Sequence, residues 1–144
     1  MDDFELPWLP AGHTLVVPGR GELFYRRFVH PDPEAPTVLL LHGLTGSTDL
    51  QFFSVYERLA ECCSFIGPDH RGHGRSEGER GHVDSFSQLL DDLESFLGLV
   101  RGEHSEAPLV LMGHSLGGLV VAALLAERKP DLLIFIDYPG FHFS

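Results

Sequence analysis

Short apolar runs alternate with amphipathic stretches along the chain. Runs bounded by glycine, proline, histidine or aspartate are typical of strands, and uninterrupted apolar runs suit strands that are buried on both faces. The first two predicted strands flank the turn-forming stretch 18–21, so we expect them to pair antiparallel. The pattern predicts strands at residues 15–17, 22–29, 37–41, 64–67, 109–112 and 132–136.

Three segments between these strands are predicted helices. Thr48 and Gln51 form a capping-box pattern for a helix that runs to about residue 62. Ser85 and Gln88 open the clearest helix, in which apolar residues recur every three or four positions. Residues 116–128 are apolar nearly all round, which predicts a buried helix. The expected core side of the second helix is Phe86, Leu89, Leu90, Leu93, Phe96, Leu97 and Val100, and its expected polar side is Asp91, Asp92 and Glu94.

Two leading strands followed by alternating strands and helices define an α/β fold. We therefore expect a single domain with a mostly parallel sheet and helices on both of its faces. In such sheets, functional residues gather at the carboxyl ends of the strands. The motifs described next all follow predicted strands, so they are expected to meet at one edge of the sheet.

Charge and composition narrow the possible partners. Ten Lys and Arg residues stand against 21 Asp and Glu residues, for a net charge of −11. This balance argues against nucleic acid as a partner and provides no basic anchor for an anionic membrane. The sequence has neither a signal-peptide pattern nor the roughly 18-residue apolar stretch of a membrane span, so we expect a cytoplasmic protein. Cys62 and Cys63 are adjacent and are expected to be reduced within a buried strand.

A G-x-S-x-G motif lies between the predicted strand 109–112 and the predicted helix 116–128. Gly113, His114, Ser115, Leu116 and Gly117 form it, and Gly118 follows. Such a strand-to-helix turn lifts the serine hydroxyl clear of the sheet, close to the N–H groups of a helix start. The spacing of its glycines matches neither of two phosphate-binding motifs, G-x-x-x-x-G-K-[ST] and G-x-G-x-x-G, so a nucleotide-binding turn is disfavoured. Ser115 is therefore the predicted nucleophile, with Gly113, His114 and Gly117 as support for the turn.

A second glycine turn follows the strand at 37–41. Acyl transfer requires two N–H donors aimed at the developing oxyanion, one from the residue after the nucleophile and one from this loop. The expected donors are the backbone N–H groups of Leu44 and Leu116. Gly43 permits a close approach of the backbone, and the side chain of His42 is expected to pack or to form hydrogen bonds.

The loop at residues 69–80 contains histidines and acidic residues beside several glycines and arginines. The glycines and arginines favour a folded loop over a metal site, and the cluster includes no cysteine. We expect Asp69 to pair with Arg71 and the loop to border the substrate pocket. No metal or organic cofactor is predicted.

Together, residues 42–44 (HGL), 69–80 (DHRGHGRSEGER), 83–86 (VDSF) and 113–118 (GHSLGG) resemble the α/β-hydrolase superfamily. More narrowly, they are similar to its lysophospholipase and monoacylglycerol-lipase-like group, also grouped with the serine aminopeptidase S33 domain. The resemblance covers about residues 14–137 and implies a sheet of eight strands, with a cap after the sixth. The catalytic acid usually follows strand seven and the base follows strand eight. The chain stops after about strand six, so we expect the N-terminal portion of such a domain over residues 1–144.

A local acid and base offer one alternative. Asp137 and His142 follow Ser115 in the order Ser, Asp, His, and Asp137 ends the sixth predicted strand. The resemblance, however, implies a base from much farther along the chain. The remaining histidines, His13, His30, His82 and His104, are expected on the surface or in loops.

Three hypotheses about function follow. The first is a serine hydrolase that acts on lipid-like or small carboxylic esters and is nearly inactive as this chain alone, because the base is missing. The second is a non-catalytic fragment or half-domain that self-associates or pairs with a partner through the exposed strand 132–136. The third is a binding protein that retains the fold without its chemistry. A dehalogenase is disfavoured because it would use a carboxylate where Ser115 stands.

Overall fold

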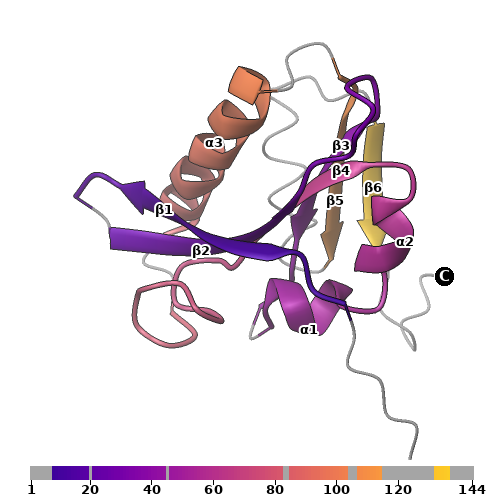
Figure 1. Cartoon of the computed structure of the whole chain (residues 1–144). Helices are drawn as coiled ribbons and strands as arrows, with labels where there is room; N and C mark the ends of the chain where they lie inside the picture. Colours follow the sequence, from indigo (N-terminus) through magenta and orange to yellow (C-terminus); the bar gives the residue numbers. More distant parts are fainter. Residues whose placement is uncertain are drawn as a thin grey trace, which may run out of the picture.

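A computed structural model describes residues 8–19, 21–44, 46–82, 85–103, 107–114 and 132–136. Figure 1 shows the described helices arranged on the two sides of a single twisted sheet. The elements in chain order are β1 (Ala11–Val17), β2 (Gly21–Phe28), β3 (Thr37–Leu41), α1 (Thr48–Phe52), α2 (Tyr56–Ala60), β4 (Ser64–Pro68), α3 (Phe86–Glu103), β5 (Leu109–His114) and β6 (Leu132–Ile136).

The strands lie in the order β1-β2-β4-β3-β5-β6. β1 and β2 pair antiparallel, β2 joins β4 antiparallel, and the pairs β3–β4, β3–β5 and β5–β6 are parallel. The predicted antiparallel start and the mostly parallel sheet are both confirmed. The order also places β3 at the centre, between the strands that precede the two longest sequence motifs.

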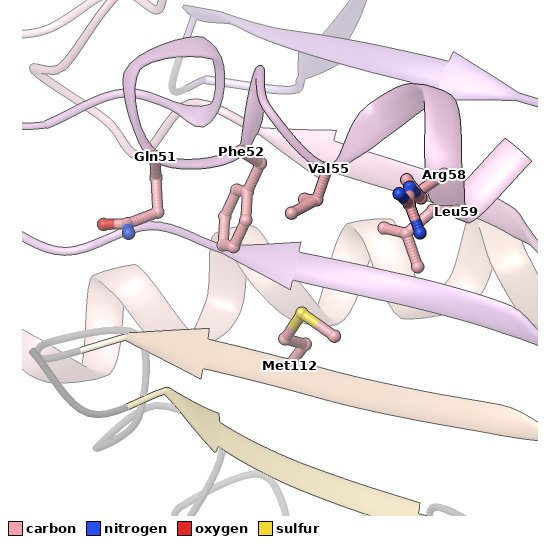
Figure 2. Close-up of a pocket in the computed structure, with 6 residues that line it drawn as sticks. All are labelled: Gln51, Phe52, Val55, Arg58, Leu59 and Met112. Atoms are coloured by element: carbon pink, nitrogen blue, oxygen red, sulfur yellow. The ribbon is translucent and has the colours of Figure 1, made fainter.

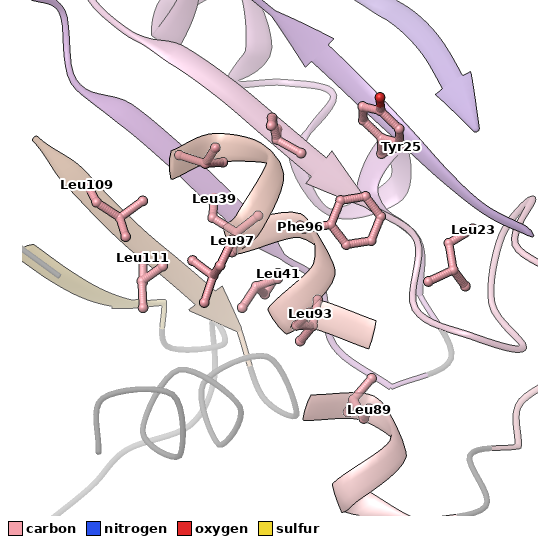
Figure 3. Packing of buried hydrophobic residues seen from close by; sticks show 12 residues of the cluster. Leu23, Tyr25, Leu39, Leu41, Leu89, Leu93, Phe96, Leu97, Leu109 and Leu111 are labelled. Carbon is pink, nitrogen blue, oxygen red and sulfur yellow. The ribbon is translucent and has the colours of Figure 1, made fainter. Parts of the chain in front are cut away.

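The sheet is apolar on both faces, as the uninterrupted apolar runs predict. Successive residues of a strand point to opposite faces, so Leu39 and Leu41 pack toward α3, whereas Val38 and Leu40 pack toward α1 and α2. Figure 3 shows α3 lying across the strands with its buried side chains directed at them. The buried side of α3 consists of Leu89, Leu93, Phe96, Leu97 and Val100.

Two expectations about α3 are wrong. Phe86, at the start of the helix, is 43% exposed. Asp92 was expected on the polar side but is only 2% exposed. Its burial has a direct cause, because the Asp92 carboxylate accepts two hydrogen bonds from Arg71, at 2.9 Å from Nε and 2.8 Å from Nη2.

The predicted helix at 48–62 is two short helices. Val55 N–H donates to Phe52 O, which tightens the chain between α1 and α2. The cap also differs from the prediction, because Ser47 is the N-cap and its hydroxyl accepts from Leu50 N–H at 3.1 Å. The Thr48 hydroxyl is instead buried and lies 3.0 Å from the Tyr56 hydroxyl.

Cys62 and Cys63 do not lie in a buried strand. They follow α2 and precede β4, with Cys62 exposed and Cys63 partly buried. Both are free thiols. The prediction of burial failed because the strand begins at Ser64, as its apolar run predicts, and the cysteines belong to the turn that leads into it.

Breaking the buried Arg71–Asp92 ion pair should strongly destabilise the fold. Removing one partner of a buried pair leaves the other charge desolvated, which typically costs about 3–5 kcal/mol. We expect this loss in the free energy of unfolding for Asp92→Asn, measured by urea titration. Asp91→Asn, at the exposed neighbouring position, is the matched control and should cost about 1 kcal/mol or less. Equal losses for the two variants would contradict this role.

Candidate active site

The carboxyl ends of three parallel strands bring the sequence motifs together. β3 pairs with β5 in a register that places Leu41 opposite Gly113, and β3 pairs with β4 so that Leu39 lies opposite Ile66. The loops that begin at His42 and Asp69, and the end of β5 at His114, therefore leave the same edge of the sheet. This is the edge at which open α/β sheets carry their sites.

His42 is buried between the loops that follow β3 and β4. Its Nδ1 lies 2.6 Å from Gly43 O, and its Nε2 lies 2.9 Å from the backbone nitrogen of His70. The backbone N–H of His70 can only donate, so Nε2 accepts and Nδ1 carries the proton. Both ring nitrogens are therefore occupied, and the ring is held as one neutral tautomer.

His70 completes a reciprocal connection between the two loops. Its Nε2 donates to His42 O at 2.7 Å, and the two ring centroids are 4.1 Å apart. Burial lowers the pKa of His42 to about 2 and that of His70 to about 4, with mutual repulsion of the charged forms as a further cause for His42. We refer to His42 and His70, with their three hydrogen bonds, as the histidine lock.

His73 packs beside the histidine lock. Its ring centroid lies 5.4 Å from that of His42, and its Nδ1 donates to Arg71 O at 2.9 Å. Across the described ranges, no group of three or more His, Cys, Asp or Glu residues is arranged to hold a metal ion. The three rings support the loops with their polar atoms and fill the space between them.

Asp69 joins the start of α1 to the loop after β4. One carboxylate oxygen accepts from Thr48 N–H at 2.7 Å, and the other accepts from Arg75 N–H at 3.0 Å. Burial raises the pKa of Asp69, and the donors from Arg75 and Thr48 act in the opposite direction. The predicted Asp69–Arg71 pairing is wrong, because Asp69 binds backbone N–H groups while Arg71 pairs with Asp92.

The loop 69–80 is folded tightly around this carboxylate. Gly74 has a φ of +51°, and a Cβ there would lie 2.2 Å from Asp69 Oδ2. Gly72 has a φ of +77°, and a Cβ there would lie 2.4 Å from Glu79 O. Ser76 ties the loop to β2, since its hydroxyl donates to Asp69 O and accepts from Phe24 N–H. The positive-φ glycines and the hydrogen bonds of Ser76 explain why this loop is folded, as the sequence predicts.

The predicted oxyanion loop has an open outer end. His42 and Gly43 are buried, whereas Leu44 is 55% exposed. Among the described residues, no hydrogen bond occupies the backbone N–H of Leu44. On β5, Gly113 and His114 are buried at the end of the strand. The other predicted site residues, Ser115, Leu116, Gly117, Asp137 and His142, lie outside the described residues.

A hollow of about 380 Å³ lies away from this edge, on the face of the sheet that carries α1 and α2. Figure 2 shows Met112 of β5 directed toward Phe52 and Val55, with Leu59 farther along. Its lining is mainly apolar, and His42, His70 and His73 do not contribute to it. None of the described residues of the candidate active site lines it.

Sequence reasoning missed the contributions of His70 and Thr48. These contacts follow from the pairing of β3 with β4, which places His70, after β4, beside His42, after β3. Without the strand order, the two loops could not be assigned as neighbours.

Comparison with solved structures shows the α/β-hydrolase fold. An α/β-hydrolase from Novosphingobium aromaticivorans superposes with a TM-score of 0.71 and 28% identity, covering 87% of this chain and 43% of that chain. A protein of unknown function from Agrobacterium tumefaciens, described as an α/β-hydrolase, gives a TM-score of 0.75 at 22% identity, covering 93% of this chain and 64% of that one. The class expected from the motifs is confirmed.

The chain belongs to the family described as serine aminopeptidase, S33 (Hydrolase_4), which matches residues 32–136. It is 42% identical over 93 residues to the monoacylglycerol lipase of Mycolicibacterium smegmatis, covering 64% of this chain and 32% of that protein. It is 43% identical over 60 residues to the monoglyceride lipase of Rattus norvegicus, covering 42% and 20%. The chain thus spans a third or less of the length of these two relatives.

The histidine lock predicts how stability depends on pH. His70 has an ordinary pKa of 6.5 when unfolded and about 4 when folded, so above pH 6.5 it is neutral in both states. As the pH falls below 6.5, the unfolded state binds the proton first and the free energy of unfolding decreases. We expect His70→Gln, which cannot titrate, to show a smaller decrease between pH 6.5 and 4 than the wild type in urea titrations. Identical pH slopes would contradict the assignment of a buried neutral His70.

Proposed function

We propose that this chain carries the nucleophile of a serine hydrolase that acts on carboxylic esters. The observation that carries the proposal is the register of β3 and β5. Leu41 lies opposite Gly113, so the loop 42–44 leaves the sheet beside the strand end that precedes Ser115 in the sequence. In the proposed reaction, the Ser115 hydroxyl attacks the ester carbonyl and water later releases the acyl group.

The backbone N–H groups of Leu44 and Leu116 are the proposed oxyanion donors. Catalysis by such donors depends on preorganisation, because a donor already in place needs no rearrangement as charge develops. Three features support this role for Leu44. The preceding residues His42 and Gly43 are fixed by the histidine lock, Leu44 itself is exposed, and none of the described residues occupies its N–H.

The proposed substrates are monoacylglycerols or small esters of similar chemistry. Two relatives bear the names monoacylglycerol lipase and monoglyceride lipase, which supports this class without fixing the acyl length. No helix among the described residues is long and apolar enough to cross a membrane. A cytoplasmic location is a further part of this proposal.

We propose that the base which activates Ser115 comes from beyond residue 144, so that the chain by itself is nearly inactive. The lock histidines do not suit the role, since both nitrogens of His42 are occupied and His70 is buried, which lowers its pKa to about 4. Loss of a triad base can reduce turnover by about a million-fold. The compact alternative, with Asp137 and His142 as acid and base, makes the opposite prediction of measurable activity.

A non-catalytic half-domain is the second candidate. β6 pairs with β5 on one side and is the last strand of the described sheet. An uncovered strand of this kind can pair with another chain. Concentration-dependent association in sedimentation experiments, without any ester hydrolysis in the longer protein, would favour this candidate.

A proline substitution tests the proposed oxyanion hole. Leu44→Pro removes the backbone N–H, and loss of one such donor typically lowers turnover by about 100- to 1,000-fold. Leu44→Ala keeps the N–H and trims only an exposed side chain, so it is the matched control and should stay within a few-fold of the wild type. The measurement is kcat for a short-chain monoacylglycerol ester in the full-length protein, with urea titrations to verify folding.

Ser115→Ala sets the baseline of this experiment and should abolish hydrolysis. The 144-residue chain should hydrolyse the ester no faster than Ser115→Ala does. Equal turnover by Leu44→Pro and Leu44→Ala would remove Leu44 from the oxyanion hole. If the 144-residue chain turns over the ester and His142→Gln abolishes this turnover, His142 is the base, as the compact alternative predicts.

A further inference from the structure

Cys62 and Cys63 form a pair of thiols on a fixed backbone. The N–H groups of both residues donate to Leu59 O, at 3.0 and 2.8 Å, where the chain leaves α2. Their sulfur atoms lie 3.3 Å apart, and both are free thiols. Cys62 is exposed and Cys63 is partly buried, so a small reagent can approach from solvent. The two sulfurs are therefore preorganised to bind one bridging atom.

The spacing favours a bridging atom over a direct sulfur–sulfur bond. Disulfides usually join Cα atoms at least about 4.4 Å apart, whereas consecutive Cα atoms are about 3.8 Å apart. Metal–thiolate bonds are about 2.3 Å long. An atom bonded to both sulfurs at this length would have a sulfur–atom–sulfur angle of about 90°, given the observed sulfur separation of 3.3 Å. A tetrahedral ion such as Zn²⁺ would require a wider angle of about 109°.

The surroundings also disfavour zinc. A structural zinc site needs four ligands, and no group of three or more His, Cys, Asp or Glu residues in the described segments is placed to hold a metal. The nearby His30 is already engaged, because its Nδ1 accepts from Asp32 N–H and its Nε2 donates to Glu61 O. The pair thus offers two sulfurs and leaves any third position on a bound atom open to solvent.

We propose that Cys62 and Cys63 form a chelating dithiol site for a trivalent, thiophilic metalloid of the arsenical class. Trivalent arsenic forms pyramidal thiolate complexes with bond angles near the one that this pair defines. With an organoarsenic oxide, the two As–O bonds break and two As–S bonds form. The oxide oxygen leaves with the two thiol protons as one water molecule, so no oxidant, reductant or net proton is needed.

The protonation state of Cys63 separates this chemistry from ordinary thiol modification. Burial, followed by its contact with Cys62, raises the pKa of the Cys63 thiol to about 11. Alkylating reagents require the thiolate, so Cys63 should react slowly with iodoacetamide near neutral pH. Condensation with an arsenic oxide can begin at the exposed Cys62, which then holds the arsenic beside Cys63 for the second As–S bond.

The dithiol site lies at the opposite edge of the sheet from the candidate active site. Cys63 precedes the first residue of β4, whereas Asp69 and His70 follow its last. A bound arsenical should therefore leave the histidine lock intact. The site also stands independently of the proposed hydrolase activity.

The test is titration of the 144-residue chain with phenylarsine oxide, followed by intact mass and by the thermal shift on binding. We expect one equivalent per chain, retained in excess monothiol and removed by 2,3-dimercaptopropanol. Cys62→Ser and Cys63→Ser are matched variants that each keep one thiol. Each should weaken binding about 100- to 10,000-fold, the usual gain from linking two attachments. Cys62→Ala, at the exposed position, repeats the test without a new hydroxyl.

Melting curves without arsenical establish that the variants fold. Unchanged affinity in folded Cys62→Ser or Cys62→Ala would overturn the proposal, as would two equivalents bound per wild-type chain. Loss of the adduct in excess monothiol would also overturn it, because it would show that the sulfurs act singly.

Discussion

The loops at the carboxyl edge of the sheet depend on one buried connection, the hydrogen-bonded pair of His42 and His70. His42 accepts from the backbone of the β4 loop and donates to Gly43, while His70 donates back to the β3 loop. Because both rings are neutral, the connection avoids the desolvation cost of a buried charge. Asp69 extends it by accepting from the Thr48 N–H at the start of α1 and from the Arg75 N–H within the loop 69–80. Three segments of the chain, the loop after β3, the loop 69–80 and the start of α1, are thereby fixed relative to one another.

This arrangement suits a site that must hold backbone donors in place before any substrate arrives. Backbone N–H groups stabilise an oxyanion best when they cannot rearrange. Buried polar networks provide rigidity when their hydrogen bonds are made, and they are costly when bonds are lost. The lock fixes His42 and Gly43, while Leu44 remains exposed at the end of the fixed turn. The buried Arg71–Asp92 pair connects the loop 69–80 to α3, so this loop is held both to the sheet edge and to a helix on one face of the sheet.

The sequence predicted the layers of this fold better than its polar contacts. The runs at 37–41 and 109–112 predicted doubly buried strands because their composition alone requires cover on both faces. The ion pair of Arg71 was misassigned because sequence proximity favoured Asp69, whereas the true partner, Asp92, lies on a helix that folds back across the sheet. The break between α1 and α2 was missed because it depends on where Tyr56 meets Thr48, which is a tertiary contact. His70 likewise acquires its place only once β3 and β4 are known to be neighbours.

The most direct test of the histidine lock is an NMR measurement of the His42 ring on ¹⁵N-labelled protein near neutral pH. The structure predicts a neutral ring protonated at Nδ1, with a scalar coupling across the hydrogen bond from the His70 amide nitrogen to His42 Nε2. It also predicts that this tautomer persists as the pH is lowered to about 5 in the folded state, because the pKa of His42 is about 2 and that of His70 about 4. A ring protonated at Nε2, or one that becomes charged near pH 6.5, would contradict the account.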